Sequence, residues 1–320
     1  MPAARTAVIV AGPTASGKSA LALALARRLD GVVINADAMQ LYRELRILTA
    51  RPSPADEALA PHALYGVRPA AALATAAWWR TAALAEMAAA RAAGRLPILC
   101  GGSGLYLLAL TEGLADIPDP GPAARSEARA LLVELGSAGL HARLAAVDPA
   151  TAARLRPSDR QRIARAYEVW RGTGTGLTAW QGRGQPRAPD WRFAAVLLDP
   201  PREELRAAAA VRFAAMLEQG ALAEARDLLA RNLDPALPAL RAHGVPELTA
   251  HLRGEIALAE AAARAIAATG RYMKRQTTWF RHHALAPGGR THMIHARIAG
   301  QAQLSERFMA DISEFIRNAG

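Results

Sequence analysis

Gly12-Pro-Thr-Ala-Ser-Gly-Lys-Ser19 is the stretch of this chain that indicates its fold. It fits the pattern G-x-x-x-x-G-K-[ST] of the phosphate-binding P-loop. The apolar residues Thr6–Val10 before it are expected to form a strand, and Ala20–Leu29 after it a helix. A strand, a P-loop and a helix in this order predict an α/β core that holds a phosphate group. A chance Gly/Ser loop before a helix is the alternative.

The residues of the P-loop have separate expected tasks. Glycines let the backbone turn so that its N–H groups surround a phosphate, and the helix N-terminus adds a partial positive charge. Lys18 supplies a full positive charge, and the Ser19 hydroxyl can bind Mg²⁺. The residues expected around the phosphate are Gly12, Pro13, Thr14, Ala15, Ser16, Gly17, Lys18 and Ser19.

Composition describes a globular protein, because 52% of the 320 residues are hydrophobic and 21% are charged. The single cysteine, Cys100, cannot form an internal disulfide, which favours a reducing compartment. The P-loop begins too near the N-terminus to leave room for a signal peptide. Charged residues interrupt Ala70–Ala93, so this stretch is expected to be a soluble helix rather than a membrane span. These features predict a cytoplasmic protein.

The formal net charge of +11 is concentrated in two zones. Arg154–Arg192 holds nine arginines and three acidic residues, and Arg264–Arg297 holds seven lysines and arginines and no acidic residue. Two concentrated basic zones are typical of a surface that binds a polyanion such as a nucleic acid. An arginine-rich composition with solvated faces is the alternative.

Polar residues follow two further expected strands. Gly31–Asp37 is expected to be a buried strand that leads into a loop at Asp37, and Leu96–Cys100 one that leads into a Gly-rich turn containing Ser103. In an open α/β sheet, ligands lie beyond the carboxyl ends of the strands. We therefore expect Asp37 and Ser103 at the same edge as Lys18. Asp37 could instead cap its loop, and Ser103 its helix.

Strand signals stop at Ile117–Pro122 and resume at Arg192–Leu198. The expected division is a P-loop NTPase-like core of residues 1–116 and 193–320, with a parallel sheet and a helical C-terminal part, and a mainly helical inserted domain of residues 117–192. The helices expected in the insert are Ala123–Gly136, Leu140–Val147, Pro149–Leu155 and Asp159–Gly172, followed by a Gly/Pro-rich break at Gly182–Pro189. Within the core, Ala55–Ala63 is expected to be a loop.

The C-terminal part is expected to be helical at Glu203–Gln219 and Ile256–Thr269, with a turn between helices at Leu240–Leu248. Arg271–Arg281 combines basic and aromatic residues. Such a segment can bind backbone phosphates and stack on bases. It can equally be an amphipathic helix whose aromatic residues lie in the core.

Asp199 and the histidines leave further possibilities. An apolar strand that ends in an acidic residue, as Arg192–Leu198 ends at Asp199, often supplies the Mg²⁺-binding partner of a P-loop. The prolines and glutamates after Asp199 suit an ordinary helix start equally well. The histidines near the C-terminus and Cys100 form no convincing zinc-binding pattern.

An ordered set of segments resembles the tRNA dimethylallyltransferases, also called tRNA isopentenyltransferases, of the bacterial type without a zinc finger. These segments are Gly12–Ser19, Asn35–Tyr42, Thr49–Pro52, Gly101–Tyr106, Asp159–Glu168 and Lys274–Arg281. The resemblance implies transfer of a dimethylallyl group from its diphosphate to the exocyclic N6 amine of the adenosine next to the anticodon in tRNA.

The resemblance also implies roles for single residues. The P-loop would hold the leaving diphosphate with Mg²⁺ bound at Ser19, and Lys18 and Arg212 would stabilise its charge. Asp37 would take the proton of the amine, and Ser103, where the family usually has Thr, would contact the substrate beside it. The implied partners are the tRNA anticodon stem-loop and dimethylallyl diphosphate, and the implied oligomeric state is a monomer.

The residues implied in tRNA binding lie in several segments. The Met39-Gln40 and Val245-Pro246 pairs depart from the pairs most common in the family. The full set is Asp37, Ala38, Met39, Gln40, Ser103, Arg125, Gln161, Arg162, Ile163, Ala164, Arg165, Arg241, Ala242, His243, Gly244, Val245, Pro246, Lys274 and Arg275.

Other functions use the same P-loop. A small-molecule kinase would place Asp199 on Mg²⁺ and use Asp37 as a base, but it leaves both basic zones unexplained. A prenyltransferase acting on free adenine nucleotides would need neither zone. A nucleotide-driven RNA-binding switch would need ATP or GTP affinity, and the sequence shows no motif that reads either base.

Overall fold

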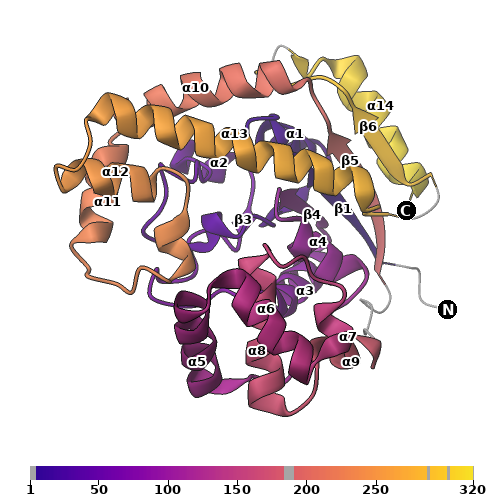
Figure 1. The fold of residues 1–320 in the computed structure, drawn as a ribbon. Coiled ribbons are helices and arrows are strands. Elements are labelled where there is room, and N and C mark those ends of the chain that lie inside the picture. Colours follow the sequence, from indigo (N-terminus) through magenta and orange to yellow (C-terminus); the bar gives the residue numbers. More distant parts are fainter. Residues whose placement is uncertain (1–4, 184–190, 287–288, 301–302, 320) are drawn as a thin grey trace. The chain divides into compact units, whose positions relative to one another are not determined.

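A parallel β-sheet forms the centre of the larger of two structural units (Figure 1). The computed structural model describes residues 5–183, 191–286, 289–300 and 303–319. Within them, six strands pair in parallel in the order β3-β2-β4-β1-β5-β6. The strands are β1 (Arg5–Ala11), β2 (Gly31–Asn35), β3 (His62–Ala63), β4 (Leu96–Gly101), β5 (Trp191–Leu198) and β6 (Thr291–Ile294). The predicted α/β core with a parallel sheet is confirmed.

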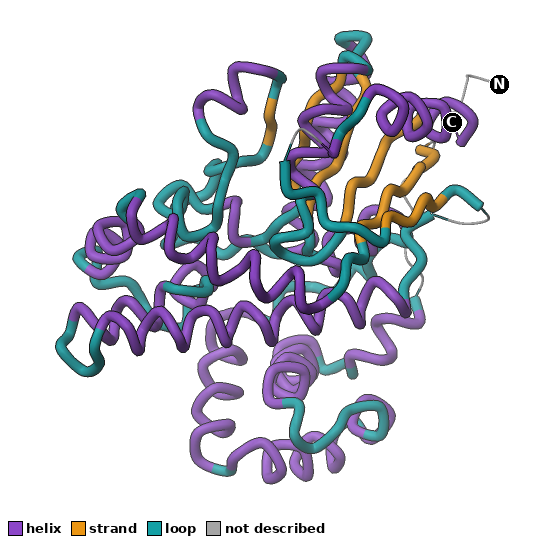
Figure 2. The backbone as a smooth tube through the Cα atoms, turned by 90° about the horizontal axis from the view of Figure 1, so that it is seen from above, coloured by secondary structure: helices purple, strands orange, loops and turns teal. Residues whose placement is uncertain are grey.

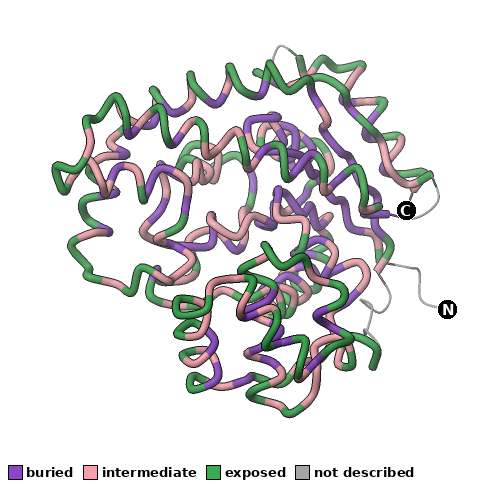
Figure 3. Tube along the Cα trace, in the orientation of Figure 1, coloured by how far each residue is buried: buried purple, intermediate pink, exposed green. Residues whose placement is uncertain are grey.

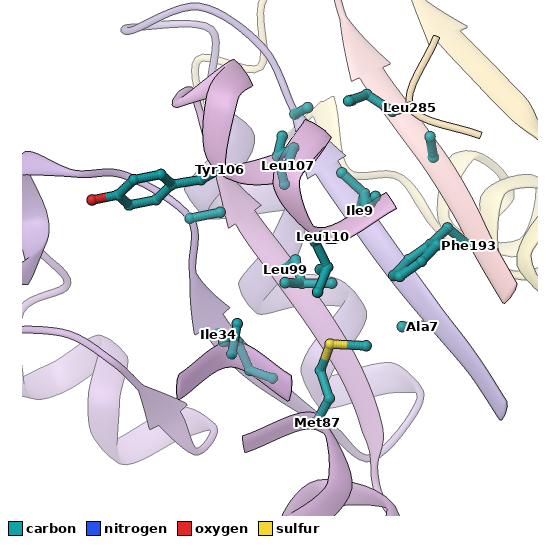
Figure 4. Packing of buried hydrophobic residues seen from close by; sticks show 14 of the residues in the cluster. Ala7, Ile9, Ile34, Met87, Leu99, Tyr106, Leu107, Leu110, Phe193 and Leu285 are labelled. Carbon is teal, nitrogen blue, oxygen red and sulfur yellow. The ribbon is translucent and has the colours of Figure 1, made fainter. Parts of the chain in front are cut away.

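Helices cover both faces of this sheet. Side chains alternate along β1, so that Ile9 belongs to one apolar cluster and Val8 and Val10 to another, as the pleat of a strand requires. Figure 4 shows Met87, Leu107 and Leu110 packed on the Ile9 side, and Figure 3 shows the buried strands between their helical layers. The Ile9 side is covered by α3 (Ala76–Ala92) and α4 (Gly104–Thr111), and the Val8 side by α1 (Lys18–Arg28) and α14 (Glu306–Ala319).

Helix α3 begins later than the sequence predicted. The expected helix Ala70–Ala93 is wrong in its first turn and a half, because Thr75 caps α3 by accepting a hydrogen bond from the Trp78 N–H. No helix of the described residues is long and apolar enough to cross a bilayer.

The prediction of a loop at Ala55–Ala63 is wrong. This stretch contains most of α2 (Pro54–Leu59) and the whole of β3. Ser53 and Asp56 form a capping box at the start of α2, and Pro54 occupies its first turn, where a missing N–H costs nothing. Ser53-Pro54 is therefore a helix-start signal in the sequence.

The C-terminal part of the larger unit packs around a third apolar cluster. Its main helices are α10 (Arg202–Glu218), α11 (Ala221–Leu229), α12 (Val245–Leu252) and α13 (Leu258–His282). Helices α10 and α13 run side by side (Figures 1 and 2). The expected helix Ile256–Thr269 and the basic segment Arg271–Arg281 form one continuous helix. In that segment Phe280 is buried, and Tyr272 and Trp279 are partly buried.

Further elements of this part of the chain differ from the expectation or were missed. Leu240–Leu248 is not a simple turn, because it includes the end of a 3-10 helix, η2 (Pro238–Arg241), and the start of α12. The Glu247 carboxylate accepts a hydrogen bond from the Gly244 N–H at 3.0 Å and so fixes the start of α12. Strand β6 and helix α14 were not predicted at all.

The smaller unit comprises residues 112–187. Ala128, Leu144, Ile163 and Tyr167 belong to its own apolar core. Its helices are α5 (Gly121–Glu134), α6 (Gly136–Val147), α7 (Pro149–Ala152), α8 (Arg160–Thr173) and α9 (Leu177–Gly182), the last of which was not expected. Residues 184–190, which include most of the break expected at Gly182–Pro189, lie outside the described residues. The predicted boundaries at 117 and 192 remain predictions.

The close approach of α4 to α13 gives a test of this packing. A Cβ atom at Gly104 would lie 2.3 Å from the Trp279 ring. We expect Gly104→Ala to destabilise the protein by about 1–3 kcal/mol through overpacking, measured as a lower midpoint of chemical denaturation.

Gly270→Ala is the matched control, because Gly270 lies in the same helix as Trp279 and a Cβ there meets nothing within 4 Å. This change should leave the midpoint unchanged or raise it, since Ala has the higher helix propensity. A Gly104→Ala protein as stable as wild type would show that the two helices pack less closely than described.

Candidate active site

The P-loop joins β1 to α1 and makes a concave backbone. Ala15 and Gly17 have φ values of +68° and +91°, the left-handed conformation that lets successive N–H groups converge. A Cβ at Gly17 would lie 2.1 Å from the Ile298 carbonyl oxygen, so only glycine fits. The buried Lys18 ammonium donates to the Pro13 carbonyl at 3.4 Å. The Ser16 hydroxyl is buried without a hydrogen-bond partner among the described residues.

The loop after β2 holds Asp37 in a fixed orientation. The fully buried Asn35 side chain accepts a hydrogen bond from the Asp37 N–H at 2.8 Å. It also donates to the carbonyl oxygens of Asp37 and Leu64, each at 3.0 Å. One carboxylate oxygen of Asp37, Oδ1, accepts from the Met39 N–H at 3.0 Å. No hydrogen bond to Oδ2 is formed within the described part of the chain, so that oxygen is free for a ligand.

Ser103 ties the turn after β4 to the Asp37 loop. Its hydroxyl oxygen accepts from the Ala38 N–H at 2.9 Å, and its own N–H donates to the Ala36 carbonyl at 3.2 Å. The pKa of the nearby Tyr272 phenol is raised chiefly by burial and further by the charge of Asp37, while Ser103 lowers it. The structure thus gives Ser103 a positioning role, and its contact with substrate stays a prediction.

A single pocket of the larger unit contains the P-loop residues Thr14, Lys18 and Ser19 together with Asp37 and Arg212. The edge of the sheet and helices α10 and α13 form its walls, as the rule for open α/β sheets predicts. Met39, Gln40, Ala242 and His243, four of the residues expected to bind tRNA, line the same pocket. Its apolar wall includes Leu48, Phe213 and Met216.

Positive charge dominates the electrostatics of this pocket. Burial lowers the pKa of Lys18, while the charge of Asp37 raises it. Burial also lowers the pKa of Arg212, Asp37 again raises it, and Arg297 lowers it further. Neither Lys18 nor Arg212 forms an ion pair with a carboxylate within the described ranges, so both charges are available to an anionic ligand.

Cys100 lies next to the P-loop but is chemically inert. It is a free, buried thiol whose pKa burial raises to about 11, although Lys18 and a hydrogen bond with Ser19 favour its thiolate. At neutral pH the thiol therefore stays protonated.

The residues around the pocket suit a magnesium ion only together with a ligand that brings its own oxygens. The described residues contain no cluster of three His, Cys, Asp or Glu side chains that could hold a metal alone. Ser19, which lines this pocket, supplies a single hydroxyl oxygen. So few protein ligands are typical of Mg²⁺ sites in which the substrate phosphates supply further oxygens.

Asp199 does not belong to this pocket. Its carboxylate accepts hydrogen bonds from the Arg281 guanidinium at 3.0 to 3.3 Å and forms an ion pair with it. The Mg²⁺-binding role considered for Asp199 is therefore not supported, because a guanidinium already occupies the carboxylate.

Other residues expected to bind tRNA lie elsewhere. Lys274 and Arg275 line a surface groove of α13, and Arg241, Val245 and Pro246 line another groove beside α12. Arg125 and Gln161–Arg165 belong to the smaller unit, where Arg125 pairs with Asp119. Ile163 and Ala164 are buried in the core of that unit, so only their neighbours Gln161, Arg162 and Arg165 present exposed or partly exposed side chains.

Gln276 is a site residue that the sequence did not reveal. Its buried side chain accepts a hydrogen bond from the Thr14 N–H of the P-loop at 2.9 Å. It donates to the Gly102 carbonyl, in the turn that carries Ser103, at 2.9 Å. A signal was present, because Met273, Gln276 and Phe280 follow the spacing of a buried helix face. A polar residue on such a face must have buried partners.

Comparison with known proteins identifies the family. A family model described as IPP transferase matches residues 40–283, and one described as isopentenyl transferase matches residues 5–61. The tRNA dimethylallyltransferase of Granulibacter bethesdensis is 61% identical over 313 residues, which cover 98% of each chain. That of Gluconacetobacter diazotrophicus is 61% identical and covers 98% of this chain and 94% of the relative.

Solved structures agree with this result. A full-length tRNA isopentenylpyrophosphate transferase from Bacillus halodurans has a TM-score of 0.67 at 28% identity, with 98% of both chains covered. A eukaryotic dimethylallyltransferase acting on tRNA has a TM-score of 0.79 at 24% identity, covers 98% of this chain and 80% of that one, and supports the fold alone. The fold is that of a P-loop NTPase-like transferase. The chain belongs to the tRNA dimethylallyltransferase family.

The Gln276 bridge predicts a loss of anion binding on substitution. Gln276→Met has a similar volume but leaves the Thr14 N–H and the Gly102 carbonyl without partners. Without these bonds the P-loop loses its tie to the Gly102 turn and is less preorganised, so we expect roughly tenfold weaker binding of inorganic pyrophosphate by calorimetry.

Gln219→Met, at an exposed position after α10, is the control and should bind pyrophosphate like wild type. If Gln276→Met also binds pyrophosphate like wild type, the bridge does not maintain the shape of the P-loop.

Proposed function

We propose that this enzyme transfers the dimethylallyl group of dimethylallyl diphosphate to the N6 amine of the adenosine next to the anticodon of certain tRNAs. The observation that carries this proposal is the pocket shared by Asp37, Lys18, Ser19 and Arg212. It combines an anion-binding loop with one available carboxylate oxygen, which are the two things that this transfer requires.

The donor fits the pocket by charge and by polarity. The P-loop N–H groups, Lys18 and Arg212 would bind the diphosphate, whose negative charge matches the unpaired cations. The apolar side chains of Phe213 and Met216 lie in the same pocket and suit a short hydrocarbon chain. The pocket therefore holds both ends of a prenyl diphosphate.

The reaction breaks the allylic C–O bond and forms a bond between that carbon and N6. The diphosphate leaves with the electron pair, and Lys18 and Arg212 stabilise the charge that develops on it. The N6 lone pair is delocalised into the adenine ring, so the amine is a poor nucleophile. Asp37 accepts the proton that N6 loses, a step typically worth about 10²–10⁴-fold in rate.

We propose Mg²⁺ as the cofactor, which the Ser19 hydroxyl would help to hold. Bound there, the ion would neutralise part of the charge on the leaving group. We also propose Gly12–Ser19 as the ligands of the diphosphate, as the sequence predicted. Thr14, Lys18 and Ser19 line the Asp37 pocket, whereas the Thr14 N–H is already bound by Gln276.

The second substrate is the anticodon stem-loop of tRNA, bound by a monomer in the cytoplasm. The target base must leave its stack to reach Asp37, as other base-modifying enzymes require. Tyr272 and His243 offer partly buried rings 5.0 Å apart, on which a displaced base could stack. Lys274, Arg275 and the exposed Arg162 would bind backbone phosphates.

Incubation of the protein with Mg²⁺, dimethylallyl diphosphate and unmodified tRNA tests this function. We expect prenylated adenosine in the digested tRNA by mass spectrometry. Prenylation of free adenine nucleotides instead of tRNA would contradict the choice of acceptor. ATP turnover on a small acceptor without prenyl product would favour a kinase.

Asp37→Asn tests the role of the carboxylate. The amide keeps the size of the side chain and can still accept from the Met39 N–H, but it is not a base. We expect the single-turnover rate to fall by about 10²–10⁴-fold while pyrophosphate affinity changes by less than about threefold. Asp311→Asn, at an exposed position of α14, should leave the rate unchanged. A wild-type rate in Asp37→Asn would exclude Asp37 as the proton acceptor.

A further inference from the structure

A second pocket opens onto the P-loop. It shares Lys18, Ser19 and Arg212 with the Asp37 pocket, and it also contains Gly17 and Arg297. Asp37 is not among its lining residues. The cationic side chains that the proposed function assigns to the diphosphate therefore face a second opening, in which Arg297 is the additional cation.

Arg297 is held firmly against the P-loop. It lies in the segment between β6 and α14, and its Nε–H donates to the Ala15 carbonyl at 2.9 Å. The next residue, Ile298, donates its N–H to the Ser16 carbonyl at 3.0 Å. Ile298 also packs so closely on Gly17 that a larger residue at position 17 would clash with it. These contacts hold the Nε end of the guanidinium, and within the described ranges its two terminal nitrogens form no hydrogen bond, while the residue lines the pocket.

The charge of Arg297 has no balancing partner in the described ranges. No carboxylate there lies within ion-pair distance of it, and the acidic residue at the pocket, Glu204, is exposed on α10. Arg297 also acts on Arg212: burial lowers the pKa of Arg212 most, Asp37 raises it, and Arg297 lowers it further. Like charges that line one pocket repel each other, and a multivalent anion bound by both would offset that repulsion.

We propose that Arg297 is a further ligand of the donor's diphosphate, binding its terminal phosphoryl group opposite Lys18 and Arg212. This inference rests on the proposed function and adds a residue to the same site. A guanidinium anchored through Nε presents two N–H groups in a plane, the geometry that binds two oxygens of one phosphoryl group. The match to the IPP transferase model ends at residue 283, so Arg297 lies beyond it.

Binding of inorganic pyrophosphate with Mg²⁺ to the full-length protein, measured by calorimetry, tests the proposal. We expect Arg297→Gln to weaken binding at least about tenfold, as the loss of a charge-assisted contact does. Arg297→Lys should recover part of the affinity, because it keeps the charge but not the paired N–H groups. Arg206→Gln, at an exposed position of α10 outside both pockets, should bind like wild type.

Kinetics and tRNA binding separate this role from others. The KM for dimethylallyl diphosphate should rise in Arg297→Gln by a similar factor, while tRNA affinity without donor stays within about twofold, because the role concerns the diphosphate alone. If Arg297→Gln is too unstable to measure, Arg297→Lys carries the test, and wild-type pyrophosphate affinity in that variant together with a wild-type KM would overturn the proposal.

Two results would contradict the inference without touching the proposed function. One is wild-type pyrophosphate affinity in Arg297→Gln, and the other is a loss of tRNA affinity with pyrophosphate affinity intact. The proposed function fails separately, if the wild-type protein binds no pyrophosphate and transfers no prenyl group.

Discussion

Hydrogen bonds between the carboxyl ends of β1, β2 and β4 hold the whole site together. The Ala36 N–H donates to the Cys100 carbonyl at 2.8 Å, and the Ser103 N–H returns a bond to the Ala36 carbonyl. Gln276 then ties the P-loop to the same turn. Because these strands are parallel and adjacent, three loops far apart in sequence meet at one edge of the sheet. The same hydrogen bonds therefore fix the positions of both the phosphate-binding loop and the Asp37 loop.

This arrangement concentrates positively charged side chains without carboxylate partners at one site, which folding normally avoids. Lys18 is buried, and neither it, Arg212 nor Arg297 has a carboxylate in ion-pair contact among the residues described. Burial of unpaired charge is costly, so such a cluster is typical of a binding site rather than of a stabilising core. Asp37 offsets part of that charge, and a diphosphate would offset the rest, which connects the electrostatics to the choice of donor.

Local patterns predicted much of the site, and long-range contacts explain what they missed. The P-loop, Asp37 and Ser103 were placed correctly at one edge because each follows a short apolar strand. Gln276 and Arg297 could not be placed in this way, since their roles depend on contacts with residues more than 250 positions away. The loop expected at Ala55–Ala63 failed for a different reason: Ser53 and Pro54, just before it, begin a capped helix.

A crystal structure with a non-reactive thio analogue of dimethylallyl diphosphate would test the central claim most directly. The account predicts the diphosphate on the P-loop between Lys18 and Arg212, with the free carboxylate oxygen of Asp37 facing the first carbon of the prenyl group. A diphosphate bound away from the P-loop, or an Asp37 carboxylate turned away from that carbon, would contradict it.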